Sequence, residues 1–136
     1  MIHTPSRILI VEDELLIAME LEDVVRDLGC TPVGPAQTTA AALAMLANDE
    51  IDVAILDIGI EEDVSFSIAD ELARSGKSWI FTSGYNPDVL RGRYADVPLV
   101  QKPFSTRDIL AAVKQMLGAQ ASRNAAGPEH QPPRAA

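Results

Sequence analysis

The sequence predicts an α/β domain built on a parallel β-sheet with helices on both faces. Short, nearly all-apolar runs alternate along the chain with longer stretches of helical period. The apolar runs lack the polar alternation of a sheet with one solvated face, so we expect them to be buried on both sides. Five strand candidates and five helix candidates in strict alternation predict a doubly wound sheet.

The first strand and the first helix have the clearest patterns. Residues 7–11 (RILIV) form an apolar run, and residues 14–28 follow with helical period until Gly29 ends the helix. Apolar positions spaced by four, three and four residues mark one face of this helix: Ile17, Leu21, Val24 and Leu28. Further apolar side chains lie off that face: Leu15, Leu16, Met19 and Val25. They form either a surface for a partner or a homodimer, or a contact with a neighbouring helix, and both interpretations stay open.

The later elements continue the alternation. Strands are predicted at residues 32–34, 53–56, 79–82 and 99–100. Helices are predicted at about residues 39–47, 64–74 and 86–97, and the last helix follows Ser105. Thr38 and Ser105 are N-cap candidates because their hydroxyls can accept a backbone N–H of the first helical turn.

The predicted domain covers residues 6–118, and residues 119–136 are expected to form a disordered tail. The tail contains six Ala, three Pro and no large apolar residue. It cannot bury enough surface to offset the entropy lost on ordering.

Composition excludes several function classes. A formal net charge of −9 repels a phosphate backbone, so we expect no nucleic-acid partner. Cys30 is the single cysteine, which excludes an internal disulfide and fits a cytoplasmic location. The charge-free stretch at residues 28–48 is interrupted by Pro32, Gly34 and Pro35, so no membrane association is predicted.

Polar side chains follow the predicted strands at the points where they end. Glu12 and Asp13 follow the first strand, Asp57 the third, Ser83 the fourth and Lys102 the fifth. Because the carboxyl ends of parallel strands meet at one edge of a sheet, we expect these groups to converge. Three carboxylates in one pocket repel one another unless a cation joins them. Carboxylate and phosphate oxygens suit Mg²⁺, and a carboxylate can itself accept a phosphoryl group.

The same residues carry a family resemblance. The chain resembles the receiver domain of bacterial two-component response regulators over about residues 6–117. Four pieces in the right order support this: ILIVEDE at residues 8–14, AILDIGI at 54–60, FTSGY at 81–85 and QKPF at 101–104. The resemblance implies a flavodoxin-like (β/α)5 fold with strand order 2-1-3-4-5.

The resemblance also implies a role for each site residue. Asp57 matches the phosphoacceptor, Asp13 the main metal-binding carboxylate, and Glu12 its neighbour, which acts on the metal through water. The backbone carbonyl of Gly59 falls where receivers supply a further ligand to Mg²⁺. Ser83 matches the switch hydroxyl. Lys102 matches the invariant lysine, which Pro103 typically follows through a cis peptide.

Two features distinguish this chain from many receivers, and the first of them points to a subgroup. FTSGY is similar to the Phe-Ala-Thr-Gly-Tyr type of motif found in an alphaproteobacterial receiver subgroup, which often works with histidine kinases of the HWE or HisKA2 type. Many receivers have an aromatic residue on the fifth strand, three positions before the lysine, and this chain has Leu99 there.

The resulting hypothesis is a single-domain response regulator that is a phosphoacceptor and not an enzyme in its own right. It would take a phosphoryl group onto Asp57 from a sensor histidine kinase or a phosphotransfer protein, with Mg²⁺. Because no residues remain for an output domain, we expect it to act on a downstream protein target by contact, or as a phosphate sink.

Two alternatives come from other classes. A phosphohydrolase with an aspartate nucleophile needs a second acid two residues after that nucleophile, and here this residue is Gly59. A receiver-like binding module that works without phosphorylation would be favoured by a missing acid, hydroxyl or lysine, and none is missing.

Overall fold

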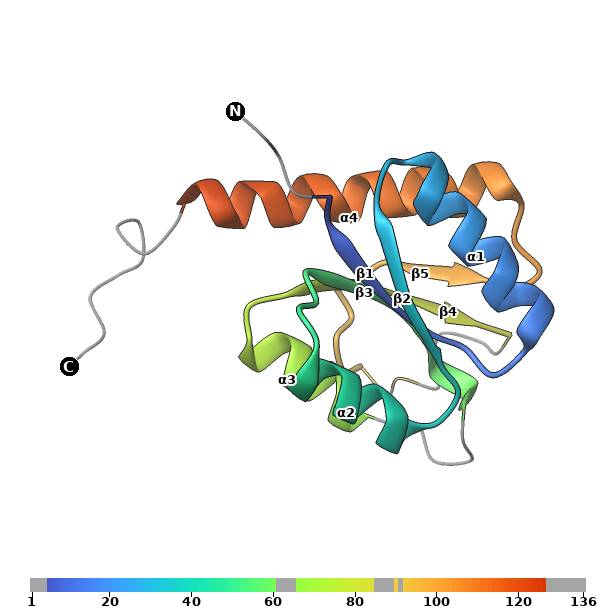
Figure 1. Ribbon diagram of the computed structural model, residues 1–136, viewed down its shortest axis with the longest axis horizontal. Helices are drawn as coiled ribbons and strands as arrows, with labels where there is room; N and C mark the ends of the chain where they lie inside the picture. The colour runs from blue at the N-terminus through green and yellow to red at the C-terminus, as the bar shows by residue number, and fades with distance from the viewer. Residues whose placement is uncertain (1–4, 61–65, 85–89, 91, 127–136) are drawn as a thin grey trace.

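The structure is a computed structural model that describes residues 5–60, 66–84, 90 and 92–126. Its centre is a parallel five-stranded sheet with strand order β2-β1-β3-β4-β5 (Figure 1). The strands are β1 (Arg7–Val11), β2 (Thr31–Ala36), β3 (Val53–Asp57), β4 (Ser78–Ser83) and β5 (Leu99–Gln101). The predicted fold class and strand order are therefore confirmed.

Helices cover both faces of this sheet, as a parallel sheet requires (Figure 1). They are α1 (Leu15–Asp27), α2 (Thr39–Asn48), the short 3₁₀ helix η1 (Ile58–Ile60), α3 (Phe66–Arg74) and α4 (Thr106–Ala126). Both predicted caps form. Thr38 Oγ1 accepts the N–H of Ala41 at 3.1 Å, and Ser105 Oγ accepts the N–H of Asp108 at 3.0 Å.

The core has two layers because side chains alternate along each strand. Ile8 and Ile10 of β1 pack with residues of α1 and α4, while Leu9 and Val11 pack with residues of α2 and α3. The central strand β3 is buried along its whole length. Because the core holds the strands in place, their carboxyl ends keep fixed positions at one edge of the sheet.

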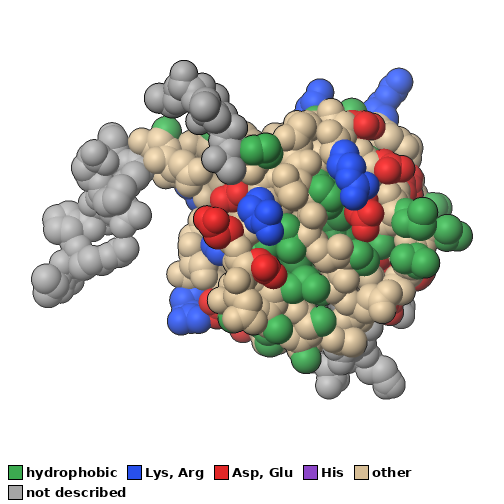
Figure 2. All heavy atoms as spheres, viewed as in Figure 1, with side chains coloured by type: hydrophobic (Ala, Val, Ile, Leu, Met, Phe, Trp, Pro, Cys, Tyr) green, Lys and Arg blue, Asp and Glu red, His purple; other side chains and the backbone are tan. Residues whose placement is uncertain are grey.

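The structure decides the interpretation of Val25, and a partner or homodimer surface at Leu15, Leu16 and Met19 stays a prediction. Val25 is fully buried beneath its neighbours, so the interpretation of Val25 as a partner surface is wrong. Leu15, Leu16 and Met19 are 60%, 80% and 51% exposed. Figure 2 shows hydrophobic side chains gathered at the end of the molecule where α1 begins.

The end of the chain differs from the prediction. Helix α4 continues to Ala126, so residues 119–126 are helical where a disordered tail was expected. Gln120 gives the physical reason, because its Oε1 accepts the N–H of Ser78 at 2.7 Å and its Nε2 donates to the carbonyl of Gly76 at 3.4 Å. These contacts tie the extension to the sheet without large apolar residues. The domain boundary at residue 118 stays a prediction, and residues 127–136 lie outside the described part.

The segment between β4 and β5 also differs from the prediction. Of the helix expected at residues 86–97, residues 85–89 and 91 lie outside the described residues, and residues 92–96 form turns. Leu90, Tyr94 and Val97 pack against the core layer beneath α2 and α3. The start of the helix expected at residue 64 likewise lies outside the described residues. Within the described ranges, no helix combines the length and the apolar character needed to cross a membrane.

Thr82 carries a hydroxyl whose Oγ1 is buried and lacks a hydrogen-bond partner among the described residues. An unpaired buried hydroxyl costs about 1–3 kcal/mol. We therefore expect Thr82→Val to raise the free energy of unfolding by about 1 kcal/mol, measured by urea denaturation. Thr106→Val, at the exposed start of α4, is the control and should change it by less than about 0.5 kcal/mol. A less stable Thr82→Val protein would show that the hydroxyl has a stabilising partner.

Candidate functional site

The predicted site residues meet at the carboxyl edge of the sheet. Glu12 and Asp13 follow β1, and Asp57 is the last residue of β3. One carboxylate oxygen from each of these three residues lies within 4.8 Å of the others. The convergence that parallel topology predicts is therefore present in the structure.

Asp57 lies at the base of the site with its carboxylate held in place. Its side chain is nearly buried, and Oδ1 accepts the N–H of Gly59 at 3.1 Å. Its other oxygen, Oδ2, lies 3.3 Å from Lys102 Nζ. Because every residue of β3 is buried, the strand gives this carboxylate a fixed position.

Glu12 is fully buried, and burial makes the charged form of its carboxyl group costly. Its Oε1 lies 3.0 Å from Lys102 Nζ, and its Oε2 accepts the N–H of Glu14 at 3.1 Å. Burial raises the pKa of Glu12 to about 7, and the negative charge of Asp57 contributes to the rise. Burial and the neighbouring carboxylate therefore both disfavour the charged form of Glu12.

Lys102 links the two buried carboxylates. Burial by itself lowers the pKa of the Lys102 ammonium, but the hydrogen bond to Glu12 and the charges of Asp57 and Glu12 outweigh it, so the pKa is raised. The Lys102 N–H donates to the carbonyl of Ser83 at 2.7 Å, which joins the ends of β4 and β5. The Lys102–Pro103 peptide is cis, as the family resemblance implies.

Ser83 is fully buried at the end of β4, one residue beyond Thr82, which pairs with Asp57 across the sheet. In front of Asp57, a pocket of about 450 Å³ opens to solvent. Its lining is mostly polar: Asp13, Glu14, Asp57, Gly59, Gly84 and Lys102. The volume is large enough for a cation together with a phosphoryl group.

Two lining residues were not predicted from the sequence to belong to the site. Glu14 and Gly84 line the pocket, and both directly follow predicted site residues. Both residues lie close to the end of a strand. That position was used to predict only Asp13 and Ser83, the residues immediately before them. Tyr85 lies outside the described residues, and Leu99 is half-buried against the core layer of α2 and α3.

The donor set fits a hard divalent cation such as Mg²⁺. All the converging groups offer oxygen atoms, and the pKa of Glu12 is raised first by burial and then by the neighbouring charge of Asp57. A cation between the carboxylates would remove this repulsion. The site thus has the chemistry of a magnesium centre beside a potential phosphoryl acceptor.

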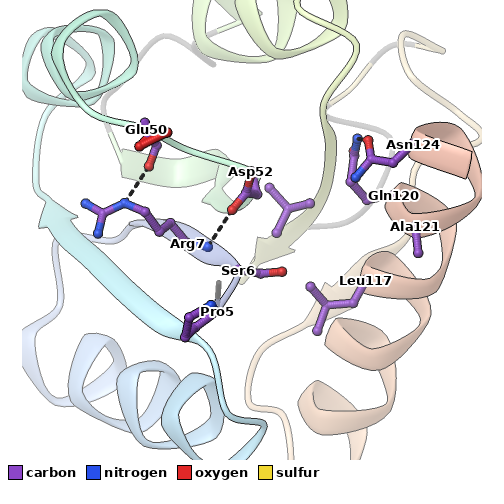
Figure 3. Close-up of a pocket in the computed structure, with 10 residues that line it drawn as sticks. Pro5, Ser6, Arg7, Glu50, Asp52, Leu117, Gln120, Ala121 and Asn124 are labelled. Carbon is purple, nitrogen blue, oxygen red and sulfur yellow. Dashed lines mark hydrogen bonds between the residues drawn. The ribbon is translucent and has the colours of Figure 1, made fainter. Parts of the chain in front are cut away.

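A second pocket lies at the opposite, amino edge of the sheet and has a different character (Figure 3). In Figure 3, the Arg7 N–H donates to Asp52 Oδ2 and the Arg7 side chain donates to the carbonyl of Glu50, each at 2.7 Å. The hydrogen-bond donors of Arg7 are thus paired with acceptors of Asp52 and Glu50, and these residues lie near the starts of β1 and β3. The pocket of about 460 Å³ is therefore separate from the carboxylate cluster.

Comparisons with known proteins agree with this geometry. Residues 8–114 match the response regulator receiver domain family. The chain is 33% identical over 121 residues to the phyllosphere-induced regulator PhyR of Methylorubrum extorquens, a match that covers 86% of this chain and 45% of PhyR. The chain spans about half the length of the curated relatives it matches.

Solved structures show the same similarity. The solution structure of SdrG from Sphingomonas melonis Fr1 matches with a TM-score of 0.70 and 39% identity, covering 88% of this chain and 99% of SdrG. The BeF3-activated conformation of SdrG, from Pseudomonas melonis Fr1, matches with a TM-score of 0.67 and 40% identity, covering 82% of this chain and 98% of that one.

Proposed function

Because the chain belongs to the response regulator receiver domain family, we propose that it accepts a phosphoryl group on Asp57 in a Mg²⁺-dependent phosphorelay. The observation that carries this proposal is the geometry around one carboxylate. Asp57 lies at the base of an open pocket, within 3.3 Å of Lys102 Nζ and in the same cluster as Glu12 and Asp13. Such a domain is a signalling module and not a classical enzyme.

The transfer itself needs little from the protein besides position and charge. A carboxylate oxygen of Asp57 attacks the phosphorus of a phosphohistidine, the P–O bond forms, and the P–N bond breaks. The leaving imidazole nitrogen keeps the electron pair and takes up a proton. Lys102 and Ser83 stabilise the negative phosphoryl oxygens.

The metal would be held by carboxylates of the same cluster. Asp13 and Asp57 are the direct carboxylate ligands in this proposal, Gly59 contributes its carbonyl, and Glu12 acts through water. Bound Mg²⁺ supplies positive charge for the phosphoryl oxygens during transfer. Lys102, whose Nζ lies 3.3 Å from Asp57 Oδ2, supplies further positive charge.

Phosphorylation would change the contacts of Lys102 and Ser83. The added group carries nearly two negative charges and strong acceptor oxygens. Lys102 is shared between Glu12 and Asp57 in the structure, so the phosphoryl group competes for it directly. The loops after β4 and β5 would then adopt a new arrangement. A BeF3-activated conformation of the similar protein SdrG supports activation of this kind here.

The proposed partners follow from this role. The donor is a sensor histidine kinase, with the HWE or HisKA2 type favoured by the FTSGY motif, or a phosphotransfer protein. The phosphorylated domain then contacts a downstream protein, or it acts as a phosphate sink that competes with other regulators for phosphoryl groups. We place this exchange in the cytoplasm.

Magnesium is expected to stabilise the protein through the carboxylate cluster. At a Mg²⁺ concentration ten times the dissociation constant, the free energy of unfolding should rise by about 1.4 kcal/mol. Thermal unfolding with and without Mg²⁺ measures this change. Asp13→Asn should lose most of it, whereas Asp23→Asn, an exposed position on α1, should keep it. An equal response in both variants would contradict the assigned ligand.

The proposed function is tested by the intact mass of the protein after incubation with acetyl phosphate and Mg²⁺. We expect a gain of one phosphoryl mass that disappears when a chelator removes the metal. If neither a mass gain nor Mg²⁺ binding were found, the binding module that works without phosphorylation would replace this proposal.

A further inference from the structure

Residues 92–97, which lead into β5, are held against α3 by polar and aromatic contacts. Asp70 on α3 is the acceptor, because its Oδ1 accepts a hydrogen bond from Arg93 Nη2 at 2.7 Å and another from the hydroxyl of Tyr94. The guanidinium carbon of Arg93 also lies 4.0 Å from the centre of the Phe66 ring, at the start of α3. We call these four residues the α3 contact.

Tyr94 adopts a backbone conformation that its residue type disfavours. Its φ is 55°, in the left-handed region, where the Cβ atom of an L-residue comes too close to the following carbonyl oxygen. A residue keeps such a conformation only where its surroundings hold it. The hydrogen bond to Asp70 holds Tyr94, and so do ring contacts with Trp79 and Phe66, whose ring centres lie 5.1 Å and 6.3 Å away. The conformation of residues 92–97 therefore depends on contacts outside this segment.

The polar part of the α3 contact is exposed, so it can be broken at small cost. The side chains of Arg93 and Asp70 are 47% and 51% exposed. Ion pairs at this exposure add little net stability, because water screens the charges and competes for the hydrogen bonds. A strained backbone that is held by weak surface contacts suits an element with two arrangements, one docked on α3 and one released from it.

The α3 contact is connected to the carboxylate site by the chain and by side chains. It links α3, which follows β3 and Asp57, to the segment that enters β5, and β5 ends one residue before Lys102. Along β4, Phe81 and Ser83 are two residues apart and therefore share one face of the sheet. The ring centre of Phe81 lies 6.4 Å from that of Tyr94. A shift at the ends of β4 and β5 is therefore transmitted to Tyr94.

We propose that the α3 contact is a latch that is closed before phosphorylation of Asp57 and opens after it. This inference rests on the proposed function and adds the element that responds. Movement of the ends of β4 and β5 toward the phosphoryl group draws Tyr94 away from Asp70 and relieves the strain in its backbone. Because the two arrangements are in equilibrium, a substitution that weakens the closed latch favours the activated form by the same factor.

The test measures the affinity of the full chain for beryllofluoride in the presence of Mg²⁺ by calorimetry. Beryllofluoride is the probe because the similar protein SdrG has a BeF3-activated conformation. Tyr94→Phe keeps the ring and removes the hydroxyl, and Asp70→Ala removes the acceptor. Each variant should bind beryllofluoride about fivefold more tightly than the wild type, which corresponds to the loss of one net hydrogen bond from the closed latch. Equal affinities of the wild type and both variants would overturn the latch.

Glu71→Gln is the matched control. Glu71 is also an acid on α3, but it pairs with Arg74 of the same helix. The substitution removes a charge and an ion pair from α3 and leaves the α3 contact intact, so this variant should bind beryllofluoride like the wild type. If it gained affinity as much as Tyr94→Phe, a general effect of α3 would replace the latch.

Fluorescence of Trp79 separates a latch from a contact that only stabilises the fold. Trp79 is the single tryptophan, and its ring lies against that of Tyr94, so we expect its emission to change when beryllofluoride binds the wild type. Binding without this change would overturn the latch. So would a Tyr94→Phe protein with a lower melting temperature and an unchanged affinity, and the proposed function would then still stand. Absence of any binding by the wild type would overturn both.

Discussion

Asp57→Asn is expected to abolish phosphoryl uptake completely. An amide offers no negatively charged oxygen to attack phosphorus and cannot form the aspartyl phosphate. Intact-protein mass after incubation with acetyl phosphate and Mg²⁺ should show one phosphoryl group on the wild type and none on the variant. The substitution also removes the negative charge that helps to raise the pKa of Glu12. We therefore expect the variant to stay folded in thermal unfolding.

The matched control for this experiment is Asp49→Asn. Asp49 is an exposed acid directly after α2 and lies outside the carboxylate cluster. It should take up phosphate like the wild type. If the Asp57→Asn protein acquired phosphate at the wild-type level, the assignment of Asp57 as acceptor would be wrong.

Lys102→Met should have the second largest effect, on both stability and reactivity. Lys102 Nζ lies 3.0 Å from Glu12 and 3.3 Å from Asp57, and both carboxylates are buried. Removing one partner of a buried ion pair typically costs about 3–5 kcal/mol, because the remaining charge is left without compensation. Here two buried carboxylates would lose the cation that they share. Because the pKa of Glu12 is about 7, that residue can take up a proton, and we expect a loss of only about 2 kcal/mol.

The same variant should label with acetyl phosphate about a hundredfold more slowly, because one of the charges that stabilises the phosphoryl oxygens is gone. Urea denaturation measures the stability change, and the time course of the intact mass measures labelling. Mg²⁺ should restore part of the lost stability, since it neutralises the same carboxylates. Lys114→Met, on the exposed face of α4, is the control for losing a lysine. Labelling at the wild-type rate would contradict the role given to Lys102.

The site could be predicted from the sequence because it depends on a topological rule. Glu12, Asp57 and Lys102 each stand at the end of an apolar run, and parallel strands place such ends at one edge. That rule needs no side-chain detail. It does not show that Lys102 is shared between Glu12 and Asp57, because the sharing depends on burial and on distances within the folded site.

The burial of Val25 shows a different limit of sequence patterns. The periodicity of α1 marked a single apolar face that includes Leu21 and Val24. In the fold, α1 contacts both the sheet and α4, so it buries a wider stripe that includes Val25 and Ala18. A helix pattern shows which side chains are apolar, but the number of neighbouring elements decides how many of them are covered.

Local sequence patterns were enough to predict the five strands, most of the helices, the strand ends that carry chemistry and the family to which the chain is similar. These are local or topological properties, set by apolar period, caps and the order of motifs. The length of α4, by contrast, depends on contacts that form only in the folded protein. Gln120 extends that helix by bonding to Ser78, 42 residues earlier in the chain, and no local pattern encodes such a contact. Helix ends held by long-range hydrogen bonds become visible only when the partner strand is in place.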